Sequence, residues 1–391
     1  MKKRIESEKI PLLLWLDDLD SDALQQAKNL ANLPFAFHHV AIMADAHVGY
    51  GMPIGGVLAT REAVIPNAVG VDIGCGMCAV KTGIIEATID QLKVIVGLIR
   101  KAIPLGFKHH LDPRPNSIMP PLPPGEVDKT FPVVSREYGS GRHQLGTLGG
   151  GNHFIELQQG SDGYVWLMVH SGSRNLGYKV ADYYNKLAKK TKVGAGWEVP
   201  KQWQLSFLPL ESKEGVQYLA EMNYCVDFAR SNRQEMMRKV QEIVSDVTGC
   251  DEFQPLLDVA HNYVAEEAHF GQQVMVHRKG ATRAFAGEPG IIPGSQGSTS
   301  YIVSGLGNPN SFASCSHGAG RILGRKQAQR SLNLQQEIAQ LEKKHILHGL
   351  RSKRDLDEAP GAYKNIGRVM NNQKDLVEIV VELSPLAVVK G

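Results

Sequence analysis

Glycine interrupts the apolar segments of this chain along its whole length. Of the 391 residues 40 are glycine, a larger share than in ordinary globular proteins, and many stand in clusters such as 149–151. Because glycine accepts backbone conformations that are closed to other residues, these clusters predict tight turns and places where the backbone closely approaches a ligand. The chain is therefore expected to contain many short strands joined by glycine turns.

The apolar patterns predict helices as well as strands, without a regular strand–helix–strand alternation. Helical spacing or composition marks residues 21–33, 88–102, 214–246 and 325–349. Strand-like runs cover residues 38–43, 54–60, 69–83, 153–158, 164–170 and 376–390, and short strands with glycine turns fill 273–305. A proline-rich surface loop is expected at about 111–125. We therefore predict an α+β fold in which residues 1–391 form one domain.

Composition excludes several classes of protein. No apolar run reaches the ~18 residues of a transmembrane helix, and the run at 10–16 lacks the cleavage pattern of a signal peptide. The five cysteines are odd in number and scattered, which argues against a disulfide framework and predicts a reducing, cytoplasmic location. A net charge of +3 permits a local phosphate-binding patch without marking the whole chain as a nucleic-acid binder.

Polar side chains in glycine-rich contexts form a candidate metal site. Asp72 and Cys75 are three residues apart around Gly74, so a tight turn can direct both at one ion. Histidines beside glycine or after strand-like runs are His153, His170, His261 and His317. A mixture of carboxylate, thiolate and imidazole suits Mn, Fe, Co or Zn better than Mg or Ca. A thiolate that bridges two ions would hold them ~3.5–4 Å apart, the spacing used in phosphoryl transfer.

Each of these residues also has a structural explanation. Cys75 and Cys78 form half of a zinc-ribbon pattern, although no second pair exists, and Cys75 alone suits an ordinary buried thiol. Asp45 and His47 either border the site or shape a turn. Histidines in polar or helical contexts receive no functional interpretation: His38, His39, His109, His110, His345 and His348.

The loop Pro293–Ser300 is dense in hydroxyl and N–H groups. It suits a phosphate or a purine edge, and equally a polar turn between strands. The chain has neither a Walker loop nor a Rossmann glycine motif, which disfavours both kinds of nucleotide site. Nearby cations suit an RNA backbone, or simply form a solvated face: Arg174, Arg278, Lys279, Arg283, Arg321 and Arg325.

Taken together, these motifs resemble the RtcB-type RNA ligases, which join RNA ends in tRNA splicing and RNA repair. The matches run in family order from about residue 35 to the last residue: Gly70–Met77, Leu145–Gly149, Gly151–Glu156, His170–Arg174, His261–Tyr263, Arg278–Ala281, Gly290–Gly297, Ser316–Arg321 and Lys390–Gly391. The resemblance implies one large domain of layered mixed β-sheets with surrounding helices. It also implies a GTP-dependent ligase that joins RNA 3′-phosphate or 2′,3′-cyclic phosphate ends to 5′-hydroxyl ends, through a guanylylated histidine and an RNA-3′-pp-G intermediate.

The same resemblance implies roles for individual residues. Two Mn²⁺ ions, or Zn²⁺ or Co²⁺, would be bound by Asp72, Cys75, His153, His170 and His261. His317 would be the nucleophile that takes GMP from GTP. The guanylate would contact Asn152, His153, Phe154, Ile155, Glu156, His261, Asn262, Pro293, Gly294, Ser295, Gln296, Ser300, His317, Gly318, Ala319, Gly320, Tyr363 and Lys390. The implied partners are GTP, RNA and the archease-type activator that some family members use.

Four positions depart from the common family pattern. They are Ala44, Asn175, Gln296 and Gly324, where Pro, Gly, Met and Ser are common. None of them removes an implied ligand or the nucleophile, so the departures bear on substrate preference and not on the chemistry. Two alternatives are a metal-dependent phosphoesterase or nucleotidyl transferase on the same scaffold that does not join ends, and a non-catalytic RNA-binding module.

Overall fold

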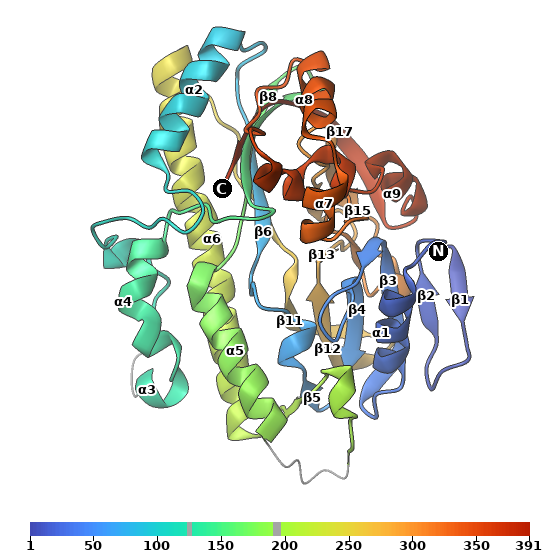
Figure 1. The fold of residues 1–391 in the computed structure, drawn as a ribbon. Helices are drawn as coiled ribbons and strands as arrows, with labels where there is room; N and C mark the ends of the chain where they lie inside the picture. Colours follow the sequence, from blue (N-terminus) through green and yellow to red (C-terminus); the bar gives the residue numbers. More distant parts are fainter. Residues whose placement is uncertain (123–126, 191–196) are drawn as a thin grey trace.

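Two large β-sheets form the centre of the computed structural model, which describes residues 1–122, 127–190 and 197–391 (Figure 1). The six-stranded sheet has the order β1 (Lys3–Ile5), β2 (Leu12–Leu14), β3 (Ala36–His47), β4 (Ile54–Thr60), β12 (Gln272–Lys279), β11 (Asn262–His269). Its strand pairs are antiparallel except β2 with β3. This sheet therefore joins the first sixty residues to a hairpin from the second half of the chain.

The second large sheet has seven strands and is antiparallel throughout. Its order is β10 (Leu257–Ala260), β6 (Gly76–Lys81), β8 (Val165–Ser171), β7 (Phe154–Gly160), β17 (Val377–Lys390), β15 (Ser300–Gly305), β14 (Pro289–Ile292). Two small ribbons pair β13 (Ala281–Arg283) with β16 (Ser314–Ser316) and β5 (Ala63–Val64) with β9 (Leu208–Pro209).

Helices surround the two large sheets. They are α1 (Ser21–Ala31), α2 (Ile89–Ala102), α3 (Val127–Thr130), α4 (Val134–Gln144), α5 (Arg174–Lys190), α6 (Lys213–Thr248), α7 (Arg325–Ser331), α8 (Leu334–Lys343) and α9 (Ile366–Asn372). Helices α2 and α6 pack on one face of the seven-stranded sheet, while α8 packs on the other. Along β6, Cys78 and Val80 face a core shared with α2 and α6, whereas Met77 and Ala79 face a core that includes Leu341 of α8. This is the alternation that a strand buried on both faces requires.

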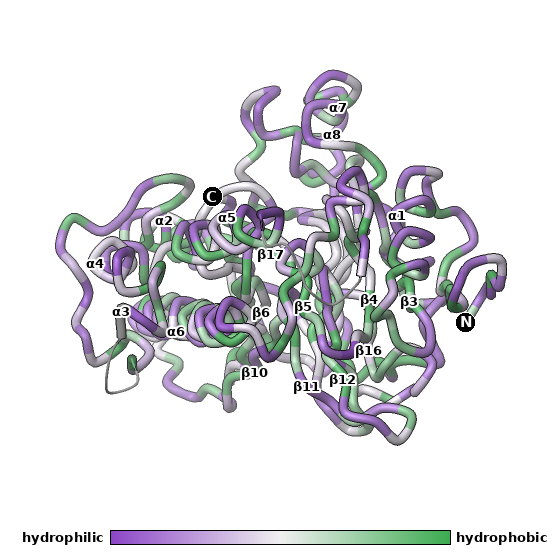
Figure 2. Tube along the Cα trace, turned by 90° about the horizontal axis from the view of Figure 1, so that it is seen from below, coloured by the Kyte–Doolittle hydropathy of each residue, from purple (hydrophilic) through white to green (hydrophobic). Residues whose placement is uncertain are grey.

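Hydrophobic residues are concentrated along the central strands, and hydrophilic residues surround them in the outer loops (Figure 2). Among the described residues, no helix combines the length and apolar character that crossing a bilayer requires.

Helix α6 is the longest helix of the described chain and begins and ends at residues suited to those positions. The Ser212 side chain accepts a hydrogen bond from the Gly215 N–H, and Gly249 ends the helix with a φ of 73°. In its middle, Arg233 is fully buried and forms two hydrogen bonds to the Asp258 carboxylate at 2.7 and 2.8 Å. The same guanidinium donates to the carbonyls of Gly74 and Ser171. Arg233 therefore ties α6 to β10, to the loop before β6 and to the end of β8.

The predicted α+β fold is confirmed, as are most of the predicted elements. The predicted helix 325–349 is wrong as one unit, because two helices occupy it and Asn333 caps the second through the N–H groups of Gln335 and Gln336. The prediction for 69–83 is a strand broken at 70–77, and within this range the strand is Gly76–Lys81. The sequence analysis missed α4, α5 and β11. Of the predicted proline-rich loop, residues 123–125 lie outside the described part.

Replacing Arg233 with alanine is expected to lower the free energy of unfolding by about 3–5 kcal/mol, since the Asp258 charge would lose its buried partner. The matched control is Arg238→Ala on the same helix, whose side chain is 53% exposed and whose buried partner Glu235 keeps a second cation, Arg114. Its loss should be at most about 1 kcal/mol. Urea unfolding of both variants measures the difference, and equal losses would contradict this account of α6.

Candidate active site

The loop before β6 directs Asp72 and Cys75 toward the ends of β7 and β8. Gly74 takes a φ of +72° there, and a Cβ at this position would lie 2.7 Å from the Cα of Val226 on α6. The turn can therefore pack against the helix only because residue 74 is glycine. His170 lies opposite both Met77 of β6 and Phe154 of β7, so the three neighbouring strands bring their side chains to one place.

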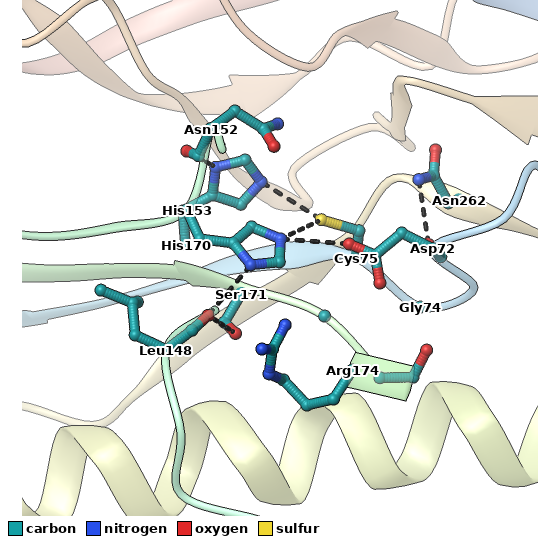
Figure 3. A network of polar contacts seen from close by, with 12 residues as sticks. Asp72, Gly74, Cys75, Leu148, Asn152, His153, His170, Ser171, Arg174 and Asn262 are labelled. Carbon is teal, nitrogen blue, oxygen red and sulfur yellow. Dashed lines mark hydrogen bonds and ion pairs between the residues drawn. The ribbon is translucent and has the colours of Figure 1, made fainter. Parts of the chain in front are cut away.

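Imidazole rings converge on the Cys75 thiol (Figure 3). Its Sγ lies 3.4 Å from Nε2 of His153 and 3.3 Å from Nε2 of His170. Nε2 of His153 also lies 3.1 Å from a carboxylate oxygen of Asp72. Cys75, His153 and His170 are buried and place one ligand atom each within 4.8 Å of one another, close enough to hold a metal ion.

Backbone carbonyls set the orientation of the two imidazoles nearest the thiol. Nδ1 of His153 donates to the Leu148 carbonyl at 2.9 Å, and Nδ1 of His170 donates to the Asn152 carbonyl at 3.0 Å. A carbonyl only accepts, so each ring donates from Nδ1 and directs its Nε2 at Cys75, where a metal ion could take the Nε2 lone pair. A hydrogen bond from the far ring nitrogen to a carbonyl orients the ring and prepares its other nitrogen to bind a metal.

His261 continues the row of rings from the thiol cluster toward His317. Its ring centre lies 5.2 Å from that of His170 and 4.8 Å from that of His317. His261 is buried, and its Nδ1 has no hydrogen-bond partner among the described residues. A buried ring nitrogen without a partner is costly, so a ligand at this atom would be stabilising.

The electrostatics of the cluster fit a bound cation. Burial, with the Asp72 charge beside it, raises the pKa of the Cys75 thiol well above its usual value. Burial and the neighbouring imidazoles lower the pKa values of His170 and His261. A divalent ion would reverse the penalty on the thiolate and use the lone pairs that the neutral rings present. The mixed donor set suits a transition metal ion such as Mn²⁺, Zn²⁺ or Co²⁺.

A cavity adjoins the cluster, and most residues predicted at the guanylate line it. The predicted residues in its wall are Asn152, Phe154, Glu156, Pro293, Gly294, Ser295, Gln296, His317, Gly318, Ala319, Gly320, Tyr363 and Lys390. His170 also reaches this wall, whereas His153 and His261 lie in the adjoining metal cluster. The metal cluster and the cavity are therefore parts of one site.

Three predicted residues direct their side chains away from the cavity. Ile155 packs in the core beneath α2 and α6, because its neighbours along β7 face the cavity. The Asn262 side chain is bonded to the Asp72 carbonyl and to the Gly280 N–H. The Ser300 hydroxyl accepts from the Gly294 N–H and from Gln158. Asn262 and Ser300 therefore hold the loops that form the site and do not line the cavity themselves.

His317 is held by a buried carboxylate that the sequence analysis had left open. Oδ2 of Asp45 lies 2.6 Å from Nδ1 of His317 and accepts the His317 backbone N–H at 3.2 Å. Burial opposes ionisation of Asp45, but the His317 ring lowers its pKa below the usual value. Gly320, with a φ of +72°, leaves room for this contact, since a Cβ there would meet the Asp45 carbonyl at 2.1 Å. Asp45 therefore engages Nδ1 of His317 and not Nε2.

Glu358 is a central residue of the cavity that the sequence analysis missed. This buried carboxylate accepts from Arg321 at 3.0 Å and from the Tyr363 hydroxyl, and lies 3.4 Å from Arg325 and 3.6 Å from Lys390. Although burial opposes ionisation, Lys390 and Arg321 hold its pKa below the usual value. No local motif marks Glu358, because its partners come from distant segments. Among cavity residues, His47, Arg321 and Arg325 were also absent from the predicted guanylate contacts.

Comparison of the sequence with known proteins assigns the chain to a family. The sequence model of the family described as "tRNA-splicing ligase RtcB" matches residues 26–119 and 125–391. The chain is 37% identical to RNA-splicing ligase RtcB1 of Escherichia coli, over 99% of both chains. It is 33% identical to tRNA-splicing ligase RtcB of Thermococcus kodakarensis, over 94% of this chain and 91% of the relative. RNA-splicing ligase RtcB of Mycobacterium tuberculosis is also 33% identical, over 94% of this chain and 100% of the relative.

Replacing Cys75 with serine should weaken binding of Co²⁺ or Mn²⁺ more than about 100-fold. Loss of a group that only hydrogen-bonds to a metal ligand costs roughly 10- to 100-fold, and loss of the ligand itself should cost more. The matched control is Cys78→Ser, since Cys78 is equally buried but faces the core on the other side of β6. Cobalt titration, followed through the thiolate absorption band, measures the affinity. Tight binding with the thiolate band in Cys75→Ser, or its loss in Cys78→Ser, would contradict the assignment of Cys75.

Proposed function

The chain belongs to the RtcB family of RNA-splicing ligases, and on this premise we propose that it is a GTP-dependent RNA ligase acting through a guanylylated His317. We propose that it joins RNA 3′-phosphate or 2′,3′-cyclic phosphate ends to 5′-hydroxyl ends, in tRNA splicing or RNA repair. The observation that carries the proposal is the position of His317. Its ring has a buried carboxylate behind it, lies beside the metal cluster and lines the cavity.

The metal cluster supplies the charge that such chemistry needs. Asp72, Cys75, His153, His170 and His261 would hold Mn²⁺, which when bound offsets the negative charge of the phosphates. The tautomers fixed by the Leu148 and Asn152 carbonyls keep Nε2 of His153 and His170 available as ligands. His317 itself is engaged by Asp45, which suits a nucleophile rather than a sixth ligand.

In the first step, Nε2 of His317 attacks the α-phosphorus of GTP. The P–N bond forms as the bond to the leaving pyrophosphate breaks. The ring becomes positively charged as its lone pair is used, and the Asp45 carboxylate on Nδ1 stabilises that charge at a distance of 2.6 Å. The product is a phosphoramidate between His317 and GMP, which has a good leaving group in its protonated imidazole.

The RNA ends then react in sequence. Water opens a cyclic end to the 3′-phosphate, and an oxygen of that phosphate displaces His317 from the GMP phosphorus. This forms the RNA-3′-pp-G intermediate and returns the free imidazole. The 5′-hydroxyl of the second strand attacks the activated 3′-phosphate, the phosphodiester bond forms and GMP leaves.

The cavity suits the guanylate. Arg321 lies 5.1 Å from the Tyr363 ring centre, and Glu358 accepts from the Tyr363 hydroxyl, so the ring is held still as a stacking surface. The loop Pro293–Gln296 borders the same cavity, and the hydroxyls of Ser300 and Ser298 hold its shape by accepting from the Gly294 and Ser295 N–H groups. GTP as the nucleotide, Mn²⁺ as the metal and a cytoplasmic location belong to this proposal, as does an archease-type activator.

A phosphoesterase or nucleotidyl transferase on the same scaffold would keep the ligands without joining ends. A gel assay with a cyclic-phosphate donor strand and a 5′-hydroxyl acceptor strand separates the two functions. Ligated product supports the ligase, and ring opening without ligated product supports the alternative.

Replacement of His317 by alanine should abolish the covalent GMP adduct formed with GTP and Mn²⁺, because this ring lines the cavity and has its Nδ1 against the Asp45 carboxylate. Intact-protein mass spectrometry measures the adduct, and metal analysis should find the ions still bound. His38→Ala serves as the control, since His38 stacks on Phe270 and does not line the cavity. An adduct on His317→Ala would place the nucleophile elsewhere.

Asp45→Asn should slow adduct formation by about 10²–10⁴-fold, the range for loss of a positioned acid–base partner. The amide is nearly isosteric but carries no charge to stabilise the imidazolium. The rate of adduct formation is measured at saturating GTP, with metal content and thermal unfolding as controls. A rate within a few-fold of the unmodified protein, with metal content unchanged, would remove Asp45 from the mechanism.

A further inference from the structure

A groove adjoins the nucleotide cavity and shares part of its wall. Gln296, Glu358 and Lys390 line both hollows, and Gly151, from the loop that carries His153, lines the groove as well. The opposite wall comes from the C-terminal end of α2, from the turn at Phe107 and from the 3₁₀ helix Lys353–Glu358 with the residues before it. The groove therefore leads from the protein surface to the site that the proposed function assigns to His317.

Three arginines in the groove have no carboxylate within ion-pair distance in the part of the chain that the structure describes. They are Arg100, Arg351 and Arg354. Burial and the neighbouring charge of Arg351 lower the pKa of Arg100. Two guanidinium groups held close together without an acid favour an anion between them.

The acidic side chains of the groove are held by other groups or have a raised pKa. Asp355 accepts from the Arg351 and Ser352 N–H groups at 2.9 and 2.8 Å, in the capping box of the 3₁₀ helix. Glu358 is surrounded by the cations of the nucleotide cavity. Burial and the Glu358 charge raise the pKa of Asp357. The unpaired arginines therefore dominate the charge that a ligand in the groove would meet.

Phe107 presents an aromatic ring at the edge of this groove. Its side chain is 99% exposed, which is unusual for phenylalanine. The turn that carries it is held in place, because the Gly106 N–H donates to the Gly149 carbonyl at 3.1 Å and Arg174 donates to the Gly106 carbonyl at 3.3 Å. Phe107 is thus fixed relative to the loop that carries His153 while its ring remains free.

We infer that this groove binds single-stranded RNA, with Phe107 stacking on a base and Arg100, Arg351 and Arg354 contacting the phosphates. Unpaired cations along a groove together with an exposed aromatic ring are the combination by which proteins hold single strands without reading their sequence. The inference rests on the proposed function and adds to it the path by which a strand reaches His317. The 3′-phosphate strand and the 5′-hydroxyl strand share this chemistry.

Two oligonucleotides, one ending in a 3′-phosphate and one in a 5′-hydroxyl, are titrated separately by fluorescence anisotropy without GTP or Mn²⁺. Phe107→Ala should weaken binding of one strand about tenfold, and Phe107→Trp should restore it. In the variant with both Arg351→Ala and Arg354→Ala, the dependence of log affinity on log salt should become shallower by about 0.7 per arginine. The strand whose affinity falls is the one that the groove carries.

Lys353→Ala is the matched control for charge, since Lys353 lies on the same turn but does not line the groove. An equal loss in this variant would overturn the inference, because general surface charge would then explain the binding. GMP adduct formation is measured on the same proteins and should persist in the groove variants. Unchanged RNA affinity in variants that still form the adduct would overturn the groove and leave the proposed function standing. Absence of the adduct in the unmodified protein would overturn the proposed function instead.

Discussion

The buried guanidinium of Arg233 is the contact on which the metal cluster depends. It satisfies the Asp258 carboxylate and the carbonyls of Gly74 and Ser171, so one side chain joins α6, β10, the loop before β6 and the end of β8. The ligand Cys75 follows Gly74, and His170 precedes Ser171. The backbone next to Cys75 and next to His170 is therefore held in place by one buried charged side chain, that of Arg233. Positioning of this kind lets a metal site keep its geometry without crowding its ligands.

Both large sheets contribute side chains to the site, and they contribute different chemical groups. The seven-stranded sheet carries His153 and His170 at the ends of adjacent strands, whereas Asp45 comes from β3 of the six-stranded sheet. His317 follows the short ribbon strand β16 and meets both, with Asp45 on one side of the ring and His261 on the other. The proposed ligands His153 and His170 and the proposed nucleophile His317 are therefore held by different strands of the fold.

Local sequence patterns predicted the strands and turns whose conformation depends on neighbouring residues. The alternation along residues 153–158 and the turn at Gly74 could be read from neighbouring residues, and the motif resemblance identified most of the cavity wall. Helix α5 was not predicted, because its exposed face is rich in lysine and tyrosine. It also contains Gly177, where a Cβ would lie 1.9 Å from the Ser173 hydroxyl. The position of Glu358 in the cavity was not predicted, because the cations that pair with this buried carboxylate are distant in the sequence. The roles of the individual site residues remain predictions.

The contact between Asp45 and His317 joins residues 272 positions apart in the chain. Contacts of such long range form late and slow the folding of a domain, because the entropy of closing a large loop is lost before they form. The carboxylate that holds His317 is therefore absent from a chain in which these two segments have not yet met. The topology makes the orientation of this ring a property of the completed fold.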